Sequence, residues 1–240
     1  MNNGKFRVGK ALLIAFSHYA HDVYPAILAP ILPLLIEKLG LSYALSGLMI
    51  FLLRSPAILN PFFGMLADRI SLRLFVILAP AVTAIAMSLA TLAPDYYILC
   101  GLLLIAGISS ASYHVPAPVL LRNFSGSRVG AGMSFFMVGG ELARTTGPLL
   151  IVGAISLWGL EGSYKIVVLG IAASLFLLIK LKDLPSQRVS TSTSSLKGFK
   201  ETLKKFRKLF LVVAGMNLSK SFLIISLTSF LPTFLTTKGI

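Results

Sequence analysis

Seven stretches of this sequence are apolar for long enough to cross a lipid bilayer, and no other feature restricts the fold as strongly. The bilayer core is about 30 Å thick, and a helix crosses it in about 20 residues. Hydrophobic residues make up 56% of the chain and charged residues only 12%, outside the usual balance of soluble domains. We therefore predict an all-α, polytopic membrane helix bundle with spans near residues 11–36, 43–66, 74–93, 96–121, 130–157, 163–181 and 209–236.

Lysine and arginine residues concentrate in alternate loops of this arrangement. They crowd the N-terminal segment and the loops after the second, fourth and sixth spans, whereas the remaining loops and the C-terminal end hold only Lys38, Lys165 and Lys238. The positive-inside rule then predicts that the N-terminus is cytoplasmic. We expect the protein to lie in the inner or plasma membrane of the cell. The same rule explains the net charge of +14, so we expect no nucleic-acid partner.

Motifs of common enzyme classes are missing from the sequence. It contains no H-E-x-x-H helix, G-x-S-x-G turn, Walker phosphate loop or Cys–His arrangement. Cys100 is the only cysteine, so the chain cannot form an intrachain disulfide or a thiolate metal cluster. The sequence therefore predicts neither an enzyme nor a bound cofactor or metal ion.

Ionisable side chains occur inside the predicted spans, where a charge costs at least about 2.5–3.5 kcal/mol. Counting along each span places Asp22, Arg54, Glu141 and Arg144 near the midplane and His114 closer to the cytoplasm. Such residues usually face the interior of a bundle and serve function. We predict a polar cavity for substrate or protons that is lined by His18, His21, Asp22, Arg54, His114, Glu141 and Arg144.

Structural roles are the alternatives for most of these residues. Arg54 and an acid can form a static pair between helices, and Glu141 and Arg144 can satisfy each other. His114 can cap the carbonyls that a nearby proline leaves free, and His18 can be a hydrogen-bonded packing residue.

Asp22 has the weakest structural alternative, because its short carboxylate has little reach to leave the core. His18 lies one helical turn before it and therefore on the same face. We predict that Asp22, oriented by His18 or His21, binds and releases protons. Arg54 or Arg144 is expected to be its counter-charge in one conformation.

A polar segment separates the sixth and seventh spans. Residues 185–195 (PSQRVSTSTSS) are rich in serine and threonine and predict a cytoplasmic linker. Residues 196–210 place leucine and phenylalanine at helical spacing among lysines and arginines, which predicts a basic amphipathic helix on anionic lipid. The alternative is a solvated loop that serves only topology. The predicted parts are a six-helix bundle (1–184), the linker with the basic helix (185–208) and a last span (209–240).

The loop after the second span reads GMLADRISLR and resembles the signature G-x-L-a-D-R-x-G-R-R of the major facilitator superfamily. The matching positions are Gly64, Leu66, Asp68, Arg69 and Arg73, whereas positions 71 and 72 depart. The resemblance implies a conformational loop. In such a loop Gly64 permits close helix approach, and Asp68 engages a neighbouring helix N-terminus or an arginine.

Further motifs are similar to the fosmidomycin-resistance-type branch of that superfamily. They are residues 125–150 (SGSRVGAGMSFFMVGGELARTTGPLL), the HD pair of the first span and YHVPAP in the fourth. Residues 146–148 (TGP) also resemble the antiporter motif of drug exporters, in which glycines and a proline bend the fifth span. The resemblance implies helix-packing roles for Gly139, Gly140, Gly147 and Pro148. The fourth-span arginine of many proton-coupled relatives is absent.

Members of this superfamily have twelve spans in two halves, with the substrate between them near the midplane. The resemblance implies a six-helix N-terminal half plus a seventh span, so we expect a fragment or the product of a split gene. The expected function is secondary active transport, with protons driving the efflux of a small organic or drug-like molecule. Expected partners are this substrate, protons, membrane lipid and a missing C-terminal half or second copy.

Two alternatives remain for the function. One is a facilitator or symporter of a small organic anion, for which Arg54 and Arg144 would bind the substrate. The other is a non-transporting, half-length membrane protein that pairs with another chain.

Overall fold

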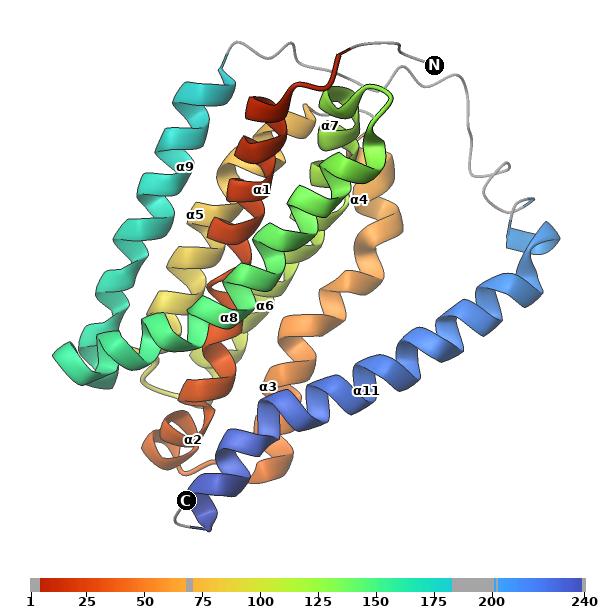
Figure 1. Ribbon diagram of the computed structural model, residues 1–240. Helices are drawn as coiled ribbons and strands as arrows, with labels where there is room; N and C mark the ends of the chain where they lie inside the picture. Colours follow the sequence, from red (N-terminus) through yellow and green to blue (C-terminus); the bar gives the residue numbers. More distant parts are fainter. Residues whose placement is uncertain (1–4, 68–70, 183–200, 202, 239–240) are drawn as a thin grey trace. The chain divides into compact units, whose positions relative to one another are not determined.

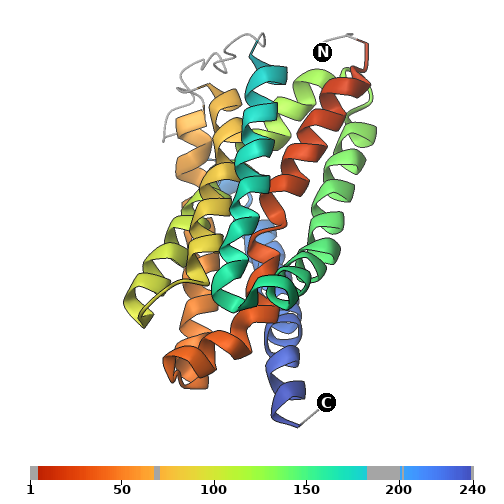
Figure 2. The same ribbon diagram turned by 90° about the vertical axis from the view of Figure 1, so that its left-hand side faces the viewer.

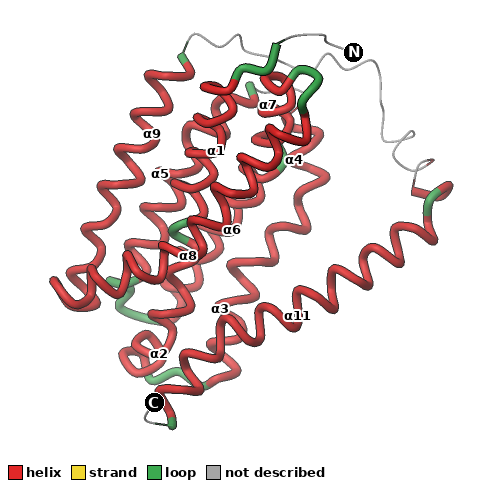
Figure 3. Tube along the Cα trace, in the orientation of Figure 1, coloured by secondary structure: helices red, strands yellow, loops and turns green. Residues whose placement is uncertain are grey.

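The computed structural model describes residues 5–67, 71–182, 201 and 203–238. Every regular element in this part of the chain is a helix (Figure 3), which agrees with the predicted all-α class. Contacts divide the chain into two units, residues 1–188 and 189–240.

The first unit is a bundle whose long helices run up and down between two ends (Figures 1 and 2). Three short 3₁₀ helices join neighbouring α-helices: η1 (Pro25–Ile27), η2 (Ser55–Leu59) and η3 (Ser163–Ile166). The α-helices are α1 (Val8–Asp22), α2 (Leu28–Leu39), α3 (Tyr43–Arg54), α4 (Asn60–Ala67), α5 (Leu72–Ala90), α6 (Tyr96–His114), α7 (Pro116–Ser125), α8 (Val129–Gly162) and α9 (Val167–Leu181).

Apolar helical stretches long enough to cross a membrane occur six times in the described parts of the chain. The longest covers residues 129–181 and contains both α8 and α9, between which the chain reverses direction (Figure 1). This stretch therefore accounts for two of the predicted spans, 130–157 and 163–181. The reversal begins at Gly159, whose positive φ of 72° is a conformation that glycine adopts without strain.

The first, second and fourth predicted spans are broken helices and not continuous ones. The breaks come at Pro25, Pro56 and Pro116, each near the start of the next helical segment. A proline has no N–H to donate and crowds the preceding turn, so it ends one helix and begins another at low cost. Each of these spans thus consists of two helical segments.

Helices α1 and α8 approach each other closely along glycines of α8. A Cβ atom on Gly139 would clash with the backbone oxygen of Ala15, and one on Gly147 would lie 2.7 Å from that of Val23. A Cβ on Gly140 would lie 2.5 Å from Cε1 of His18. The absence of side chains at these positions is therefore what lets α1 and α8 pack at this distance, as small residues do between membrane helices.

The outer surface of this unit is apolar, as lipid contact requires. Large hydrophobic side chains remain exposed along α8 and α9, including Leu149, Leu157, Val168 and Ile179. An exposed apolar surface of this extent is unusual for a soluble monomer. A buried cluster that includes Ile14, Tyr113 and Phe136 lies inside and joins α1 to α5, α6, α7, α8 and α9.

The second unit contains one long helix, α11 (Arg207–Thr237), which covers the predicted seventh span at 209–236. Most of the predicted linker and basic amphipathic helix, residues 183–200 and 202, lies outside the described residues.

Replacing Gly139 by alanine tests the close contact between α1 and α8. The new methyl group would meet the backbone of Ala15, which cannot move aside as a flexible side chain can. We expect Gly139→Ala to lower the free energy of unfolding by about 1–3 kcal/mol, the usual cost of overpacking. Gly153→Ala is the matched control in the same helix, because nothing lies within 4 Å of a Cβ there. Denaturation of the purified protein in detergent gives both values, and equal stability of the two variants would contradict the packing described.

Candidate functional site

Three of the broken helices end at an ionisable residue. Helix α1 ends at Asp22, α3 at Arg54 and α6 at His114, and a proline follows each of them within three residues. The C-terminal end of a helix carries partial negative charge, which favours the cationic forms of arginine and histidine and disfavours a carboxylate. Asp22 therefore needs donors from elsewhere.

All three histidines of the chain place a ring nitrogen within hydrogen-bonding distance of Asp22. His21 Nδ1 lies 2.8 Å from Asp22 Oδ1, and His114 Nε2 lies 3.3 Å from the same oxygen. His18 Nε2 lies 3.2 Å from Oδ2. The contact between His18 and Asp22 follows from their four-residue spacing, whereas His114 comes from α6 and was predicted to lie closer to the cytoplasm. We name these four residues the His–Asp cluster.

His18 and Asp22 hold a proton between them. The Nδ1 atom of His18 lies 2.7 Å from the backbone oxygen of Phe136, and a carbonyl oxygen can only accept, so Nδ1 is the donor. Its other nitrogen faces a carboxyl oxygen, and two acceptors at that distance would repel. One proton therefore lies between Nε2 and Oδ2, carried by the imidazole or by the carboxyl group.

Aromatic rings enclose the His–Asp cluster. Phe136 of α8 stacks on His18 with ring centroids 3.8 Å apart, and Tyr113 of α6 stacks on His21 at 4.5 Å. The Tyr113 hydroxyl is 2.7 Å from that of Ser17, which ties α6 to α1. His21 is fully buried, and its Nε2 atom has no hydrogen-bond partner in the described residues. The cluster is thus shielded from water on its His21 side and held by three helices.

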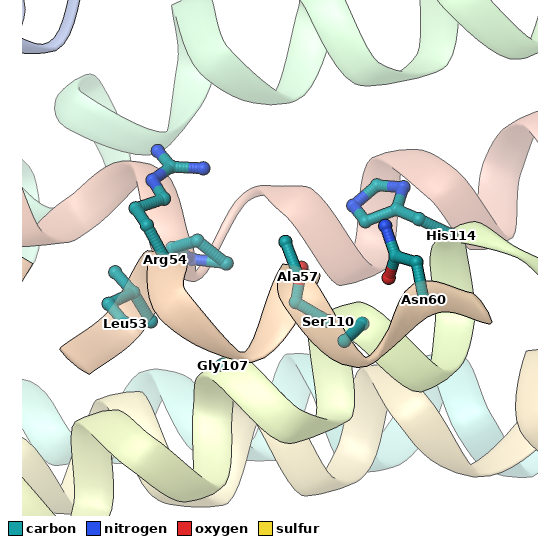
Figure 4. Close-up of a pocket in the computed structure, with 9 residues that line it drawn as sticks. Leu53, Arg54, Ala57, Asn60, Gly107, Ser110 and His114 are labelled. Atoms are coloured by element: carbon teal, nitrogen blue, oxygen red, sulfur yellow. The ribbon is translucent and has the colours of Figure 1, made fainter. Parts of the chain in front are cut away.

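Arg54 is not paired with Asp22 in this structure. Its side chain extends from the end of α3 and lines a cavity of about 120 Å³ between α3, α4 and α6 (Figure 4). Asn60 and His114 lie next to each other at the other end of this cavity (Figure 4). The predicted pairing of Asp22 with Arg54 or Arg144 stays a prediction for another conformation.

Glu141 and Arg144 pair with each other on α8. Their side chains are 2.8 Å apart and about 60% exposed. This is the mutual pairing that was the structural alternative for these two residues. The structure therefore does not bring Glu141 and Arg144 into the His–Asp cluster.

The loop after the second span is described only in part, because Asp68 and Arg69 lie outside the described residues. Arg73 donates to the backbone oxygens of Leu181 and Lys182, at the end of α9. Lys10 reaches the oxygen of Lys180 in the same turn, so basic side chains cap α9. Among the described residues, a Cβ on Gly64 would meet Val115, at an ordinary contact distance of 3.7 Å.

The His–Asp cluster also has the spacing of a metal site, since ligand atoms of His18, Asp22 and His114 lie within 4.8 Å of one another. The distances from nitrogen to oxygen, 2.8–3.3 Å, are those of hydrogen bonds. Proton binding by the cluster stays a prediction.

Two groups of the candidate site were not predicted from the sequence, the backbone oxygen of Phe136 and the side chain of Asn60. The backbone oxygen of Phe136 sets the protonated nitrogen of His18, and no residue pattern reports a carbonyl group. Asn60 lies among apolar residues between two proline-containing turns, and a polar side chain in the middle of a predicted span is the signal that identifies it.

The proton assignment can be checked by ¹⁵N NMR of protein labelled at its three histidines. We expect His18 Nδ1 to stay protonated in Asp22→Asn, because its acceptor on Phe136 is unchanged. The signals of His18 Nε2 and His21 Nδ1 should shift, since both atoms contact the replaced carboxyl group. The exposed carboxylate variant Glu161→Gln is the control and should change none of them. An unprotonated Nδ1 on His18 would refute the assignment.

Comparisons with known proteins give two findings. The family model described as Major Facilitator Superfamily matches residues 12–240. The chain is also similar to the Fosmidomycin resistance protein of Escherichia coli (strain K12), with 24% identity over 169 residues. The matched region covers 70% of this chain and 41% of that relative, which is less than half of the relative's length. Both findings confirm the resemblance noted in the sequence.

Proposed function

Because the chain belongs to the major facilitator superfamily, we propose that it is a proton-coupled secondary transporter that exports a small organic or drug-like molecule. Membership makes it a multi-pass membrane protein of a transporter family and not an enzyme. Export is the direction suggested by the name of its relative, a resistance protein. The His–Asp cluster is the observation that carries the proton coupling.

The proposed coupling depends on the fact that the partners of Asp22 come from different helices. His18 and His21 belong to the same helix as Asp22, whereas His114 belongs to α6 and the acceptor of His18 belongs to α8. A movement of α1 against α6 and α8 breaks the contacts with His114 and Phe136 and leaves the other two. The affinity of the cluster for its proton then differs between two conformations, which is what coupling of protons to transport requires.

The exposed side chains of Glu141 and Arg144 support a second proposal, that another membrane segment covers this face of the bundle. The side chains of Glu141 and Arg144 are exposed within a predicted span, where contact with lipid would be costly. A second six-helix half or a second copy of the chain would enclose them, as the two halves do in this superfamily.

The gathering of basic side chains supports the proposed orientation, with the N-terminus in the cytoplasm and the protein in the inner or plasma membrane. Arg73 and Lys10 cap α9, and the backbone N–H of Arg7 donates to the oxygen of Phe124 at the end of α7. These residues mark one end of the bundle, and the positive-inside rule assigns that end to the cytoplasm.

Transport by Asp22→Asn tests the proton coupling. In inverted membrane vesicles that contain the complete transporter, with its second half present, the wild type should concentrate the probe fosmidomycin when a pH gradient is imposed. The variant has no carboxyl group to hold the proton, so it should lose uphill transport and keep downhill exchange. Glu161→Gln removes an exposed carboxylate that pairs with Lys38 and should transport normally.

Uphill transport by Asp22→Asn would make Asp22 structural and Glu141 the next candidate. Absence of any fosmidomycin transport by the complete wild-type transporter would refute the proposed substrate.

Cysteine labelling tests the orientation. In a Cys100→Ser background, single cysteines replace Ser127 in the turn before α8 and Pro94 in the turn before α6, both of which are exposed. We expect an impermeant maleimide to label Pro94→Cys in intact cells and Ser127→Cys only after the membrane is opened. The reverse pattern would place the N-terminus outside.

A further inference from the structure

Arg54 is a cation without a counter-ion among the described residues. The two acids in the neighbouring part of the bundle are engaged elsewhere, because Asp22 contacts three histidines and Glu141 pairs with Arg144. No described residue forms an ion pair or a side-chain hydrogen bond with Arg54. A guanidinium group inside a predicted span is costly unless an anion or polar groups meet it.

The cavity beside Arg54 supplies room for such an anion. Its volume is about 120 Å³, whereas about 10–15 Å³ is enough to hold one water molecule. Pockets that enclose an entire drug-sized ligand are larger, about 300–1,000 Å³. The cavity is therefore the right size for one functional group of a larger molecule and too small for all of it.

The polar side chains of this cavity can complete the coordination of an anion. Asn60, Ser110 and His114 line it together with Arg54, and the remaining wall is mostly apolar (Figure 4). The Asn60 side-chain oxygen is buried and has no partner in the described part of the chain. The amide can therefore donate to an oxyanion through its nitrogen and accept from a hydroxyl group through this oxygen.

We propose that this cavity is an oxyanion subsite, in which Arg54 binds a carboxylate or phosphate group of the transported molecule. Asn60 and Ser110 hydrogen-bond the same group, and the exposed position of Arg54 leaves the cavity accessible to it. Arginine suits this role because its planar fork of N–H donors matches the two oxygens of such a group. The inference rests on the proposed function, since it assigns an acidic group to the substrate.

Direct binding to the 240-residue protein tests the subsite without any gradient. The protein is placed in phosphatidylcholine nanodiscs and titrated calorimetrically with sodium phosphate and, separately, sodium benzoate, each against sodium chloride. We expect saturable binding to the wild type and a loss of roughly tenfold or more in affinity in Arg54→Gln, since a charged hydrogen-bonding partner is removed. Arg54→Lys keeps the charge and should lose less.

Arg122→Gln is the matched control, because this exposed arginine lies in α7 and does not line the cavity. Circular dichroism and gel filtration check that each variant is folded. Failure of both anions to bind the folded wild type, or equal binding to Arg54→Gln, would overturn the proposal.

A second lipid composition identifies the source of the oxyanion. If binding of phosphate and benzoate persists in phosphatidylglycerol nanodiscs, the subsite serves a soluble molecule. If anionic lipid abolishes it, a headgroup occupies the cavity and the assignment to the transported molecule is overturned.

The result of this binding test does not depend on the result of the transport test on Asp22→Asn. Anion binding that depends on Arg54 can occur without proton coupling, and proton coupling can occur with a substrate that has no acidic group.

Discussion

A carboxylate buried in a membrane bundle needs compensation, and the arrangement around Asp22 follows from that need. Asp22 ends α1, where the helix dipole is unfavourable to it, and its contacts in the described part of the chain come from side chains. The three histidines of the chain provide these contacts, and the aromatic rings of Tyr113 and Phe136 hold two of the histidines in place. The contacts that compensate the charge of Asp22 are therefore also contacts by which α6 and α8 pack against α1.

The proline breaks and the ionisable residues depend on one another. A continuous helix would satisfy its own backbone, whereas the α-helices that end at Asp22, Arg54 and His114 are each followed by a proline within three residues. Irregular backbone at membrane depth is tolerated where it is buried in protein or lines a cavity. The cavity beside Arg54 lies against two of these breaks, at Pro56 and Pro116, and Pro25 at the third lines it.

Long apolar runs made the helical bundle predictable, because only helices satisfy the backbone of such segments inside lipid. Helical periodicity likewise predicted the contact of His18 with Asp22 and offered the pairing of Glu141 with Arg144 as an alternative. The contact of His114 with Asp22 was not predictable, since counting residues to find depth assumes straight, continuous spans. Prolines break both helices concerned, and a backbone acceptor such as that on Phe136 carries no signal in the sequence.

Because two histidines lie on the helix of Asp22, the first span carries partners for its own acid when it inserts into the membrane. As the first span emerges during synthesis, two partners of the carboxyl group are already present: His18 lies one helical turn before Asp22, and His21 is its neighbour in the chain. The charge is therefore partly neutralised before any other helix has entered the membrane, which lowers the cost of inserting a span that contains an acid. His114 and the carbonyl of Phe136 complete the set only when the fourth and fifth spans follow.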